Sequence, residues 1–291
     1  MDRNQAVGLV LIAVLLIGYS LVFKPPVQEQ PLVTTDSTTV STPADIAVEK
    51  PQTEAPDAVE QDSVLSSQYG VFASAMNGEN NKFQVETEKA RYNFSTKGGI
   101  IESVELKEYL NHRKEPLILF DSESSSLDLQ IGTTHGIIDL TDLYFVPDSQ
   151  PELVQAGDST QIVFTATLAD GSTVQQTYTL FGDRYDLHYN LKLNGLQNKV
   201  LSNEITWVWE DKMKRFETNL DDARNKTTVR YYTLTEDSDN LKEMSNEAQQ
   251  ETIGEGIKWA SFSQKFFNAG IISQNGFTSG TLFNAPVNDT S

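Results

Sequence analysis

An uncharged apolar run near the N-terminus constrains this chain most. The sequence AVGLVLIAVLLIGYSLVF, from Ala6 to Phe23, contains no acidic or basic residue. As a helix it would span roughly 27 Å at about 1.5 Å per residue, which is close to the hydrocarbon thickness of a bilayer. We therefore predict a transmembrane helix in residues 1–24. The residues that we assign to this membrane anchor are Ala6, Leu9, Ile12, Leu16, Tyr19 and Phe23.

A cleaved secretory signal peptide is the alternative interpretation of this run. Such a peptide has an apolar core of roughly 7–15 residues, followed by a cleavage site with small residues. The apolar run exceeds that length, and the one weak match to a cleavage site, Gly18-Tyr19-Ser20, falls inside it. The length of the apolar run and the poor cleavage site both favour an uncleaved signal anchor, which contacts the lipid bilayer.

The basic residues beside the span are nearly balanced, because Arg3 lies before it and Lys24 after it. The long region that follows is acidic and has few basic residues near the span, as exported domains do. We therefore expect a short N-terminus in the cytoplasm and the bulk of the chain on the far side of the membrane.

Charge and composition exclude several classes of function. The formal net charge is −19, so the chain repels nucleic-acid phosphates, and we expect no nucleic-acid partner. The chain has no cysteine, which excludes disulfides, thiolate zinc sites and a cysteine nucleophile. The three histidines, His112, His135 and His188, fall in separate segments without metal-ligand spacing. We expect no metal, no cofactor and no catalytic residue.

A polar tract separates the apolar run from the rest of the chain. Six of the ten prolines lie between Lys24 and Asp62, among Thr, Ser, Glu and Asp. Such a composition cannot bury a core, and it is typical of an extended tether. We predict a disordered linker over residues 25–68 and a folded domain over residues 69–291.

Period-two alternation of apolar and polar residues predicts antiparallel strands in that domain. Phe83, Val85 and Thr87 share one face of a first strand, and Tyr185 to Leu193 alternate in the same way. Residues 90–95 and 100–106 flank Lys97-Gly98-Gly99 and predict a hairpin. Residues 161–168 and 173–180 flank Asp170-Gly171, a dipeptide suited to a type I′ turn.

Many short strands without intervening amphipathic helices favour a large antiparallel β-sandwich. Residues 229–234 predict a further strand beside two short helices near the C-terminus, over residues 238–250 and 264–268. The predicted fold is therefore mainly β, with an N-terminal transmembrane helix, a disordered linker, and a sandwich with short C-terminal helices.

Two tryptophans form the one pattern that resembles a binding wall. Trp207 and Trp209 share a face of the predicted strand 204–209, and Glu210 and Asp211 follow them. Aromatic rings beside carboxylates are typical of carbohydrate sites. Large rings at strand spacing more often belong to a core, and we favour that interpretation.

The order of features resembles a known family. The Met1-Asp2-Arg3-Asn4 start leads directly into the apolar run, and the tether is followed by FSTKGGIIESVELKEY at residues 94–109 and IKWASFSQKFFNAGII at residues 257–272. With these features the chain resembles the N-terminal half of bacterial YidC-type membrane protein insertases, most closely the form found in Bacteroidetes. The resemblance covers essentially the whole chain.

The resemblance implies a periplasmic domain with a β-supersandwich fold, held at the inner membrane by the first helix. Family members insert membrane proteins and help them to fold, with or without the Sec translocon, so nascent membrane proteins and Sec components are the implied partners. Their insertase groove is built from five further transmembrane helices and contains a functional arginine. No second apolar run of that length occurs here, so we expect a fragment of an insertase that lacks the groove.

Two alternatives stay open. The family's periplasmic domain resembles sugar-binding and mutarotase-like sandwiches, so a membrane-tethered carbohydrate-binding or mutarotase-like protein is the alternative function. A stand-alone tethered binding module is the third, if the natural gene ends at Ser291. Near the end of the domain, Phe266, Phe267 and Ile271 either pack in the core or couple the domain to the missing insertase core.

Overall fold

The computed structural model describes residues 64–235 and 238–287. The predicted membrane anchor and nearly all of the predicted linker lie outside the described residues. Within the described part, no helix has the length and apolar character needed to cross a membrane. Residues 64–69 are helical and lead into a 3-10 helix, η1 (Gly70–Ala75), so regular structure begins shortly before residue 69.

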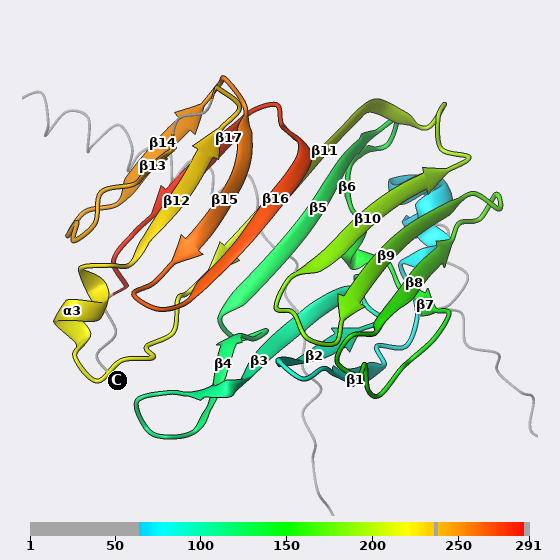
Figure 1. The fold of residues 1–291 in the computed structure, drawn as a ribbon. Coiled ribbons are helices and arrows are strands. Elements are labelled where there is room, and N and C mark those ends of the chain that lie inside the picture. The colour runs from blue at the N-terminus through cyan, green and yellow to red at the C-terminus, as the bar shows by residue number, and fades with distance from the viewer. Residues whose placement is uncertain (1–63, 236–237, 288–291) are drawn as a thin grey trace, which may run out of the picture. The chain divides into compact units, whose positions relative to one another are not determined.

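Antiparallel strands in five sheets make up most of the described chain (Figure 1). The first sheet, in the order β1-β2-β3-β4, contains β1 (Lys82–Glu86), β2 (Ala90–Ser95), β3 (Ile100–Leu110) and β4 (Pro116–Phe120). The second, β10-β9-β8-β7, contains β7 (Val146–Pro147), β8 (Ser159–Thr167), β9 (Thr173–Phe181) and β10 (Leu187–Asn194). The third, β11-β5-β6, contains β5 (Ser125–Thr133), β6 (Gly136–Asp139) and β11 (Val200–Asp211).

Two further sheets form the C-terminal part of the described chain. The larger, in the order β13-β12-β15-β16, contains β12 (Thr228–Thr233), β13 (Ser238–Asn240), β15 (Ile257–Ser263) and β16 (Asn268–Phe277). The smaller is the pair β14 (Gln249–Ile253) and β17 (Gly280–Asn284). Short helical turns lie between sheets at η2 (Leu140–Asp142) and α3 (Leu220–Arg224). The prediction of a mainly β, antiparallel domain is confirmed.

The alternation in sequence matches the burial of the strands. In β1, Val85 is fully buried while Gln84 is exposed, and Thr87 just after the strand is buried again. In β10, Leu187, Tyr189, Leu191 and Leu193 are half-buried against the core, and the residues between them are exposed. The strand predicted at residues 229–234 is β12.

Both predicted hairpins are present. β2 and β3 pair around Lys97-Gly98-Gly99, where Gly98 and Gly99 have φ of 78° and 60°, values that favour glycine. The fully buried side chain of Gln176 reaches this turn from β9, and its Nε2 donates to the Gly98 carbonyl oxygen at 2.7 Å. The turn of the first sheet is therefore tied to the second sheet by a buried hydrogen bond.

The turn between β8 and β9 differs from the predicted type. A type I′ turn needs positive φ at both central residues, but at this turn Gly171 has a φ of 83° while Asp170 has no positive φ. The Gly171 N–H donates to the Leu168 carbonyl at 3.0 Å, and the Leu168 N–H donates to Ser172 at 2.9 Å. These bonds close a three-residue loop that ends in a left-handed glycine, and Asp-Gly suits that loop equally well.

The two predicted C-terminal helices are wrong. Residues 264–267 form a tight turn between β15 and β16, in which the Gln264 N–H donates to the Phe267 carbonyl at 2.8 Å, and Asn268 begins β16. Residues 238–250 contain β13, a turn with Met244 at a φ of 55°, and the start of β14. Leu241 is buried there but Met244 is 65% exposed, so the segment buries no continuous apolar face of the kind that a helix would present.

Aromatic side chains join the first sheet to the second. The ring of Phe94 on β2 lies 5.4 Å from Phe83, 5.7 Å from Phe164 and 5.2 Å from Tyr178, measured between centroids. Phe94 and Phe164 are fully buried. These rings are part of one large core shared by the first three sheets and η1.

A smaller core lies between the two C-terminal sheets. Its members are Val229, Tyr231, Leu241, Ile253, Ile257 and Leu282. The Tyr231 hydroxyl donates to Glu251 on β14 at 3.1 Å, so a polar bond accompanies the apolar packing. The two cores are bridged at Phe262 on β15, whose ring lies 4.8 Å from Trp209 on β11.

Replacing Gly171 tests the observed turn. We expect Gly171→Val to destabilise the domain by about 1 kcal/mol or more, because a β-branched residue is strained at positive φ. No atom lies within 4 Å of a Cβ built there, so the cost would come from the backbone alone. Urea unfolding of residues 64–291 measures it. Gly254→Val, at an equally open glycine without positive φ, should stay near wild type, and equal midpoints for all three proteins would contradict the turn assignment.

Candidate functional site

The two tryptophans of β11 are used in packing. The Trp209 indole N–H donates to Ser125 Oγ at 2.9 Å, and its ring meets Phe262 at 4.8 Å and Phe120 at 6.2 Å. The Trp207 ring meets Tyr189 at 5.6 Å and packs on the large core. Both rings are half-buried. They therefore hold sheets together, as the core interpretation predicts, and do not form an open stacking wall.

The carboxylates after these rings differ in environment. Glu210 is exposed, whereas Asp211 is half-buried and its Oδ1 has no hydrogen-bond partner among the described residues. Burial raises the pKa of Asp211 to about 6, and the nearby charge of Lys214 only partly opposes the rise. Lys214 itself pairs with Asp121. Burial acts to raise the pKa of Asp121 as well, but the hydrogen bond from Lys214 brings it below its usual value.

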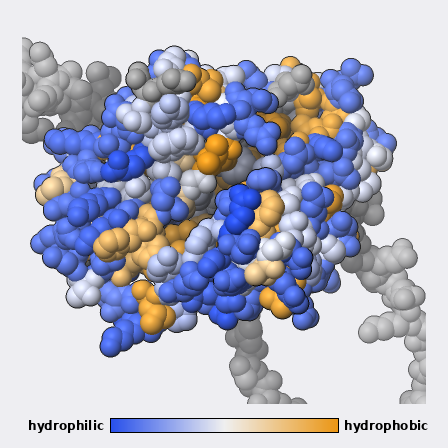
Figure 2. Space-filling model, in the orientation of Figure 1, coloured by the Kyte–Doolittle hydropathy of each residue, from blue (hydrophilic) through white to orange (hydrophobic). Residues whose placement is uncertain are grey.

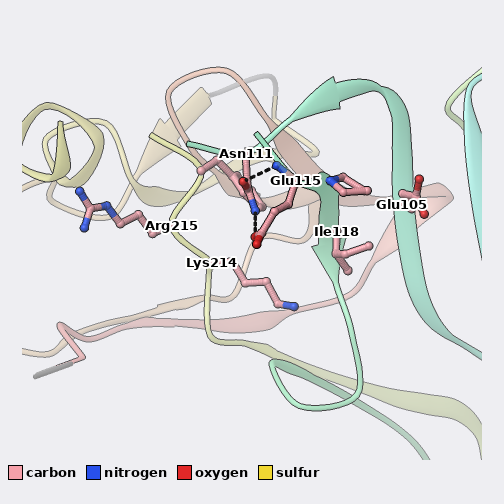
Figure 3. A pocket seen from close by; sticks show the side chains of 8 residues that line it. Glu105, Asn111, Glu115, Ile118, Lys214 and Arg215 are labelled. Atoms are coloured by element: carbon pink, nitrogen blue, oxygen red, sulfur yellow. Dashed lines mark hydrogen bonds between the residues drawn. The ribbon is translucent and has the colours of Figure 1, made fainter. Parts of the chain in front are cut away.

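A groove of about 380 Å³ lies where the segment after β11 passes the hairpin of β3 and β4 (Figure 3). It is lined by Glu105, Asn111, Glu115, Pro116, Ile118, Lys214, Arg215 and Phe216. This lining combines apolar side chains with carboxylates, an amide and two basic groups, but no histidine. The groove was missed by sequence reasoning, although the basic segment 212–215 in an acidic chain was a signal of it.

The charged and amide side chains that line the groove have partners within the protein. Asn111 Nδ2 donates to Glu115 at 3.1 Å, and the Glu115 N–H donates back to Asn111 Oδ1 at 3.1 Å (Figure 3). The Arg215 guanidinium donates to the carbonyl oxygens of Glu217 and Thr218, at 3.0 Å and 2.6 Å. These bonds fix the loop and the strand ends, and they do not present a carboxylate and a base to a common point.

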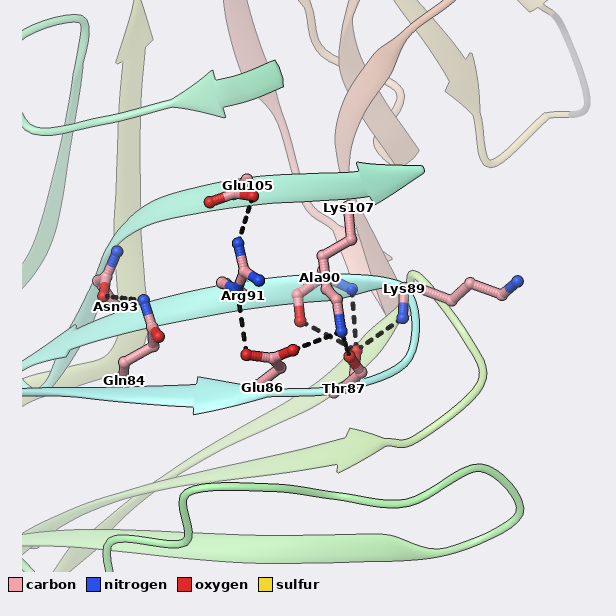
Figure 4. Close-up of polar contacts among 9 residues, drawn as sticks. All are labelled: Gln84, Glu86, Thr87, Lys89, Ala90, Arg91, Asn93, Glu105 and Lys107. Carbon is pink, nitrogen blue, oxygen red and sulfur yellow. Dashed lines mark hydrogen bonds and ion pairs between the residues drawn. The ribbon is translucent and has the colours of Figure 1, made fainter. Parts of the chain in front are cut away.

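A network of charges covers the outer face of the first sheet (Figure 4). Arg91 bonds Glu86 at 3.0 Å and Glu105 at 2.7 Å, across three neighbouring strands. Lys107 bonds Glu86 at 2.5 Å and the Thr87 carbonyl at 2.7 Å. Hydrogen bonds from Lys107 and Arg91 hold the pKa of Glu86 below its usual value. Opposite charges directly across strands stabilise sheet pairing, so the network has a structural role.

The histidines stay apart in the structure. His112 lies in the turn between β3 and β4, His135 in the turn between β5 and β6, and His188 on β10. His188 packs edge-on against Phe181 at 5.0 Å. Across residues 64–235 and 238–287, no group of three or more potential ligands is arranged to hold a metal ion.

The predicted coupling residues separate into two environments. Phe267 is half-buried, and its ring meets Tyr109 at 5.2 Å and Phe216 at 5.3 Å. Phe266 is 65% exposed, and the Lys265 ammonium lies 4.7 Å above its ring. Ile271 is half-buried on β16. One phenylalanine of the pair is thus packed and the other faces solvent. The anchor residues Ala6, Leu9, Ile12, Leu16, Tyr19 and Phe23 lie outside the described residues.

Comparison with known proteins identifies relatives over the whole chain. The YidC periplasmic domain family matches residues 82–288. The membrane protein insertase YidC of Cytophaga hutchinsonii is 33% identical over 303 residues, which cover 99% of this chain and 47% of that protein. The corresponding insertase of Amoebophilus asiaticus is 29% identical over 287 residues, with 98% and 46% covered.

A third relative gives the same result. The membrane protein insertase YidC of Parabacteroides distasonis is 28% identical over 298 residues, which cover 97% of this chain and 46% of that protein. The chain therefore spans about half the length of the curated relatives that it matches. These matches confirm the resemblance carried by residues 94–109 and 257–272, which form the β2–β3 and β15–β16 hairpins.

Alanine variants of the phenylalanine pair should differ. We expect Phe267→Ala to cost about 2–3 kcal/mol of unfolding free energy, less than the roughly 3–5 kcal/mol of a fully buried ring. Phe266→Ala should change it by less than about 0.5 kcal/mol, because its ring is mostly exposed. Urea unfolding of residues 64–291 compares them. Equal losses for the two variants would show that the packing is misassigned.

The pH dependence of stability should report on Asp211. The pKa of Asp211 is higher in the folded than in the unfolded protein, so between about pH 4 and 6 the folded state keeps a proton that the unfolded state has lost. Stability therefore falls as the pH rises through this range, and above it the half-buried Asp211 carboxylate destabilises the fold. Asp211→Asn should therefore stabilise the domain by about 1–2 kcal/mol at pH 7, a value reduced for partial exposure. Below about pH 4 the advantage should vanish. Unfolding at pH 3.5 and pH 7 tests this, and a pH-independent difference would refute it.

Proposed function

Because the chain belongs to the YidC family of membrane protein insertases, we propose that it supplies the membrane anchor and periplasmic domain of such an insertase. The whole protein would insert inner-membrane proteins and help them to fold, with or without the Sec translocon. The observation that carries the proposal is the family match over residues 82–288, joined to relatives that align with nearly all of the chain. Its substrates would be nascent membrane proteins, and Sec components its partners.

The proposed location is the bacterial inner membrane, with the β domain in the periplasm. The uncharged run from Ala6 to Phe23 would be the single anchor, and residues 25–68 the tether that separates it from the domain. The chain as a whole has a formal net charge of −19 and would be repelled by anionic lipid headgroups, which suits a domain held off the bilayer.

We assign the domain over residues 69–291 to the supersandwich fold. The packing of the first sheet on the second through Phe94 and Phe164 supports this assignment, as does the antiparallel pairing of neighbouring strands. The role of the domain would be binding and positioning without catalysis. The internal bonds of the groove in Figure 3 support that role, because its acidic and basic side chains already have protein partners.

The three residues proposed to couple the domain to the insertase core differ in exposure, and we assign them different roles. They are Phe266, Phe267 and Ile271. Phe267 and Ile271 would position the β15–β16 turn through their packing, and Phe266 would make the contact with the insertase core. The Phe266 ring is 65% exposed and so has apolar surface left to bury. The Lys265 ammonium above this ring is held by the Asp222 carboxylate at 2.5 Å.

Retention of the anchor tests the first part of the proposal. Protein extracted from membranes should carry the N-terminal run intact, because the run is long and its cleavage site is poor. N-terminal sequencing or intact mass gives the answer. A mature chain that starts near Ser20 or Pro25 would contradict the anchor.

Depletion of the protein in its own bacterium tests the second part. Periplasmic loops of newly made inner-membrane proteins should become less accessible to external protease in spheroplasts, because insertion slows. Restoring the wild-type gene should restore accessibility. Unchanged accessibility for a set of Sec-dependent and Sec-independent reporters would reject the insertase function.

A further inference from the structure

The C-terminal sheet ends at β16, and in the described part of the chain β15 is the one strand that is hydrogen-bonded to it. β16 pairs regularly with β15 from Asn268 to Ile272, and the register then shifts before Phe277. Figure 1 shows β16 in orange-red as the last strand of its sheet. An edge of this kind presents unpaired backbone N–H and C=O groups, to which another extended chain can bind.

Edge strands are normally protected, and most edges of this domain follow that rule. Proteins protect an edge with charged residues, with proline or by keeping the strand short. Among the described edge strands, such features are Lys82 and Glu86 on β1, Pro116 on β4, Asp139 on β6, Pro147 on β7, Lys192 on β10, Glu204 and Glu210 on β11, Asp239 on β13 and Glu251 on β14.

β16 departs from this rule. Its sequence, NAGIISQNGF, has neither a charged residue nor a proline, and at 10 residues it is the longest described edge strand of that kind. β17 also lacks both features, and its 5 residues equal the regularly paired part of β16 from Asn268 to Ile272. An unprotected edge is a hazard for aggregation, so its presence in a strongly charged chain calls for a binding role.

An apolar row leads across the sheet to this edge. Tyr232 on β12, Trp259 on β15 and Ile272 on β16 are directly opposite one another, so they share one face. The rings of Tyr232 and Trp259 are stacked with centroids 6.2 Å apart and planes 8° apart. Ile272 at the end of the row is 74% exposed. In Figure 2, apolar side chains reach the surface over β16 on a face that is otherwise mainly hydrophilic.

Charge decides which kind of strand would bind. Two copies of a chain with a net charge of −19 repel each other, which disfavours an edge-to-edge dimer. A segment with basic residues is attracted by the same field. Because β16 carries no charge, pairing with it would bury no charged group of the domain. An apolar side chain beside Ile272 would extend the row of Tyr232 and Trp259 by one strand.

We propose that the edge of β16 at Asn268 to Ile272 binds an extended, apolar segment of another polypeptide that is flanked by basic residues. The added strand would pair with the backbone of β16 and place one large apolar side chain against Ile272. The inference rests on the proposed function in one respect: an insertase meets incompletely folded membrane proteins, which expose apolar segments.

Binding of a defined peptide tests the proposal on the full chain in lipid nanodiscs. The probe is a fluorescein-labelled peptide of about 12 residues, with alternating Val and Thr between pairs of Lys, and empty nanodiscs are the blank. Anisotropy should show saturable binding. Ile272→Lys should weaken it by about tenfold or more, because a charge protects the edge and removes the apolar contact.

Two controls separate strand pairing from general adhesion. Ile137→Lys makes the same change at a residue with the same 74% exposure on β6, and it should leave binding within about twofold. A peptide N-methylated at every residue between the Lys pairs keeps its side chains but has no backbone N–H on either edge, so it should lose binding by about tenfold or more. Equal binding of the methylated peptide, or equal effects of the two Lys variants, would overturn the proposal.

Sedimentation and the depletion experiment complete the test. A dimer of the chain that Ile272→Lys dissociates would show that a second copy occupies the edge, and it would overturn the proposal. Absence of peptide binding together with impaired insertion on depletion would reject this site and leave the proposed function standing. Peptide binding with the expected variant effects, but without an insertion defect, would support the site and reject the insertase function.

Discussion

The rest of the described structure depends on the packing of Phe94 against Phe164. These two fully buried rings lie 5.7 Å apart and belong to different sheets, and Phe83 and Tyr178 complete the contact from either side. Truncating one such ring in a core costs roughly 3–5 kcal/mol, a large share of the stability of an ordinary domain. The contact also fixes where the Lys97-Gly98-Gly99 turn lies relative to the second sheet, because Phe94 lies three residues before that turn. The turn is thereby brought over β9.

A single buried polar side chain sets how the two sheets align. Gln176 is fully buried, donates to the Gly98 carbonyl at 2.7 Å and accepts from the Tyr189 hydroxyl at 3.0 Å. A Cβ on Gly99 would lie 3.0 Å from Gln176 Nε2, so the glycine and the glutamine constrain each other. An apolar contact tolerates sliding, whereas a buried amide that misses its partners is costly. The turn, the glutamine and the tyrosine therefore act as one unit that fixes the alignment of the sheets.

The contacts between the N-terminal sheets and the C-terminal part shape the functional surface. Trp209 meets Phe262, and Phe267 meets both Tyr109 and Phe216, so the β15–β16 hairpin is held near its turn. These contacts leave Phe266 and the apolar row ending at Ile272 on the outside. A domain that positions other chains needs a rigid base and an exposed apolar surface, and this hairpin combines the two.

Sequence by itself determined many of the strands, the family and the acidic, cysteine-free character of the chain. Alternation such as Tyr185 to Leu193 reports directly which side chains face a core, because successive side chains of a strand point to opposite faces. Sequence did not determine the loop type at Gly171, the absence of helix in residues 238–250, the groove, or the difference between Phe266 and Phe267. Each of these depends on a partner that is distant in the chain, such as Phe216 and Tyr109 for Phe267. Local spacing records that a side chain is apolar, but only the tertiary structure decides which apolar side chain finds a neighbour and which strand edge stays unpaired.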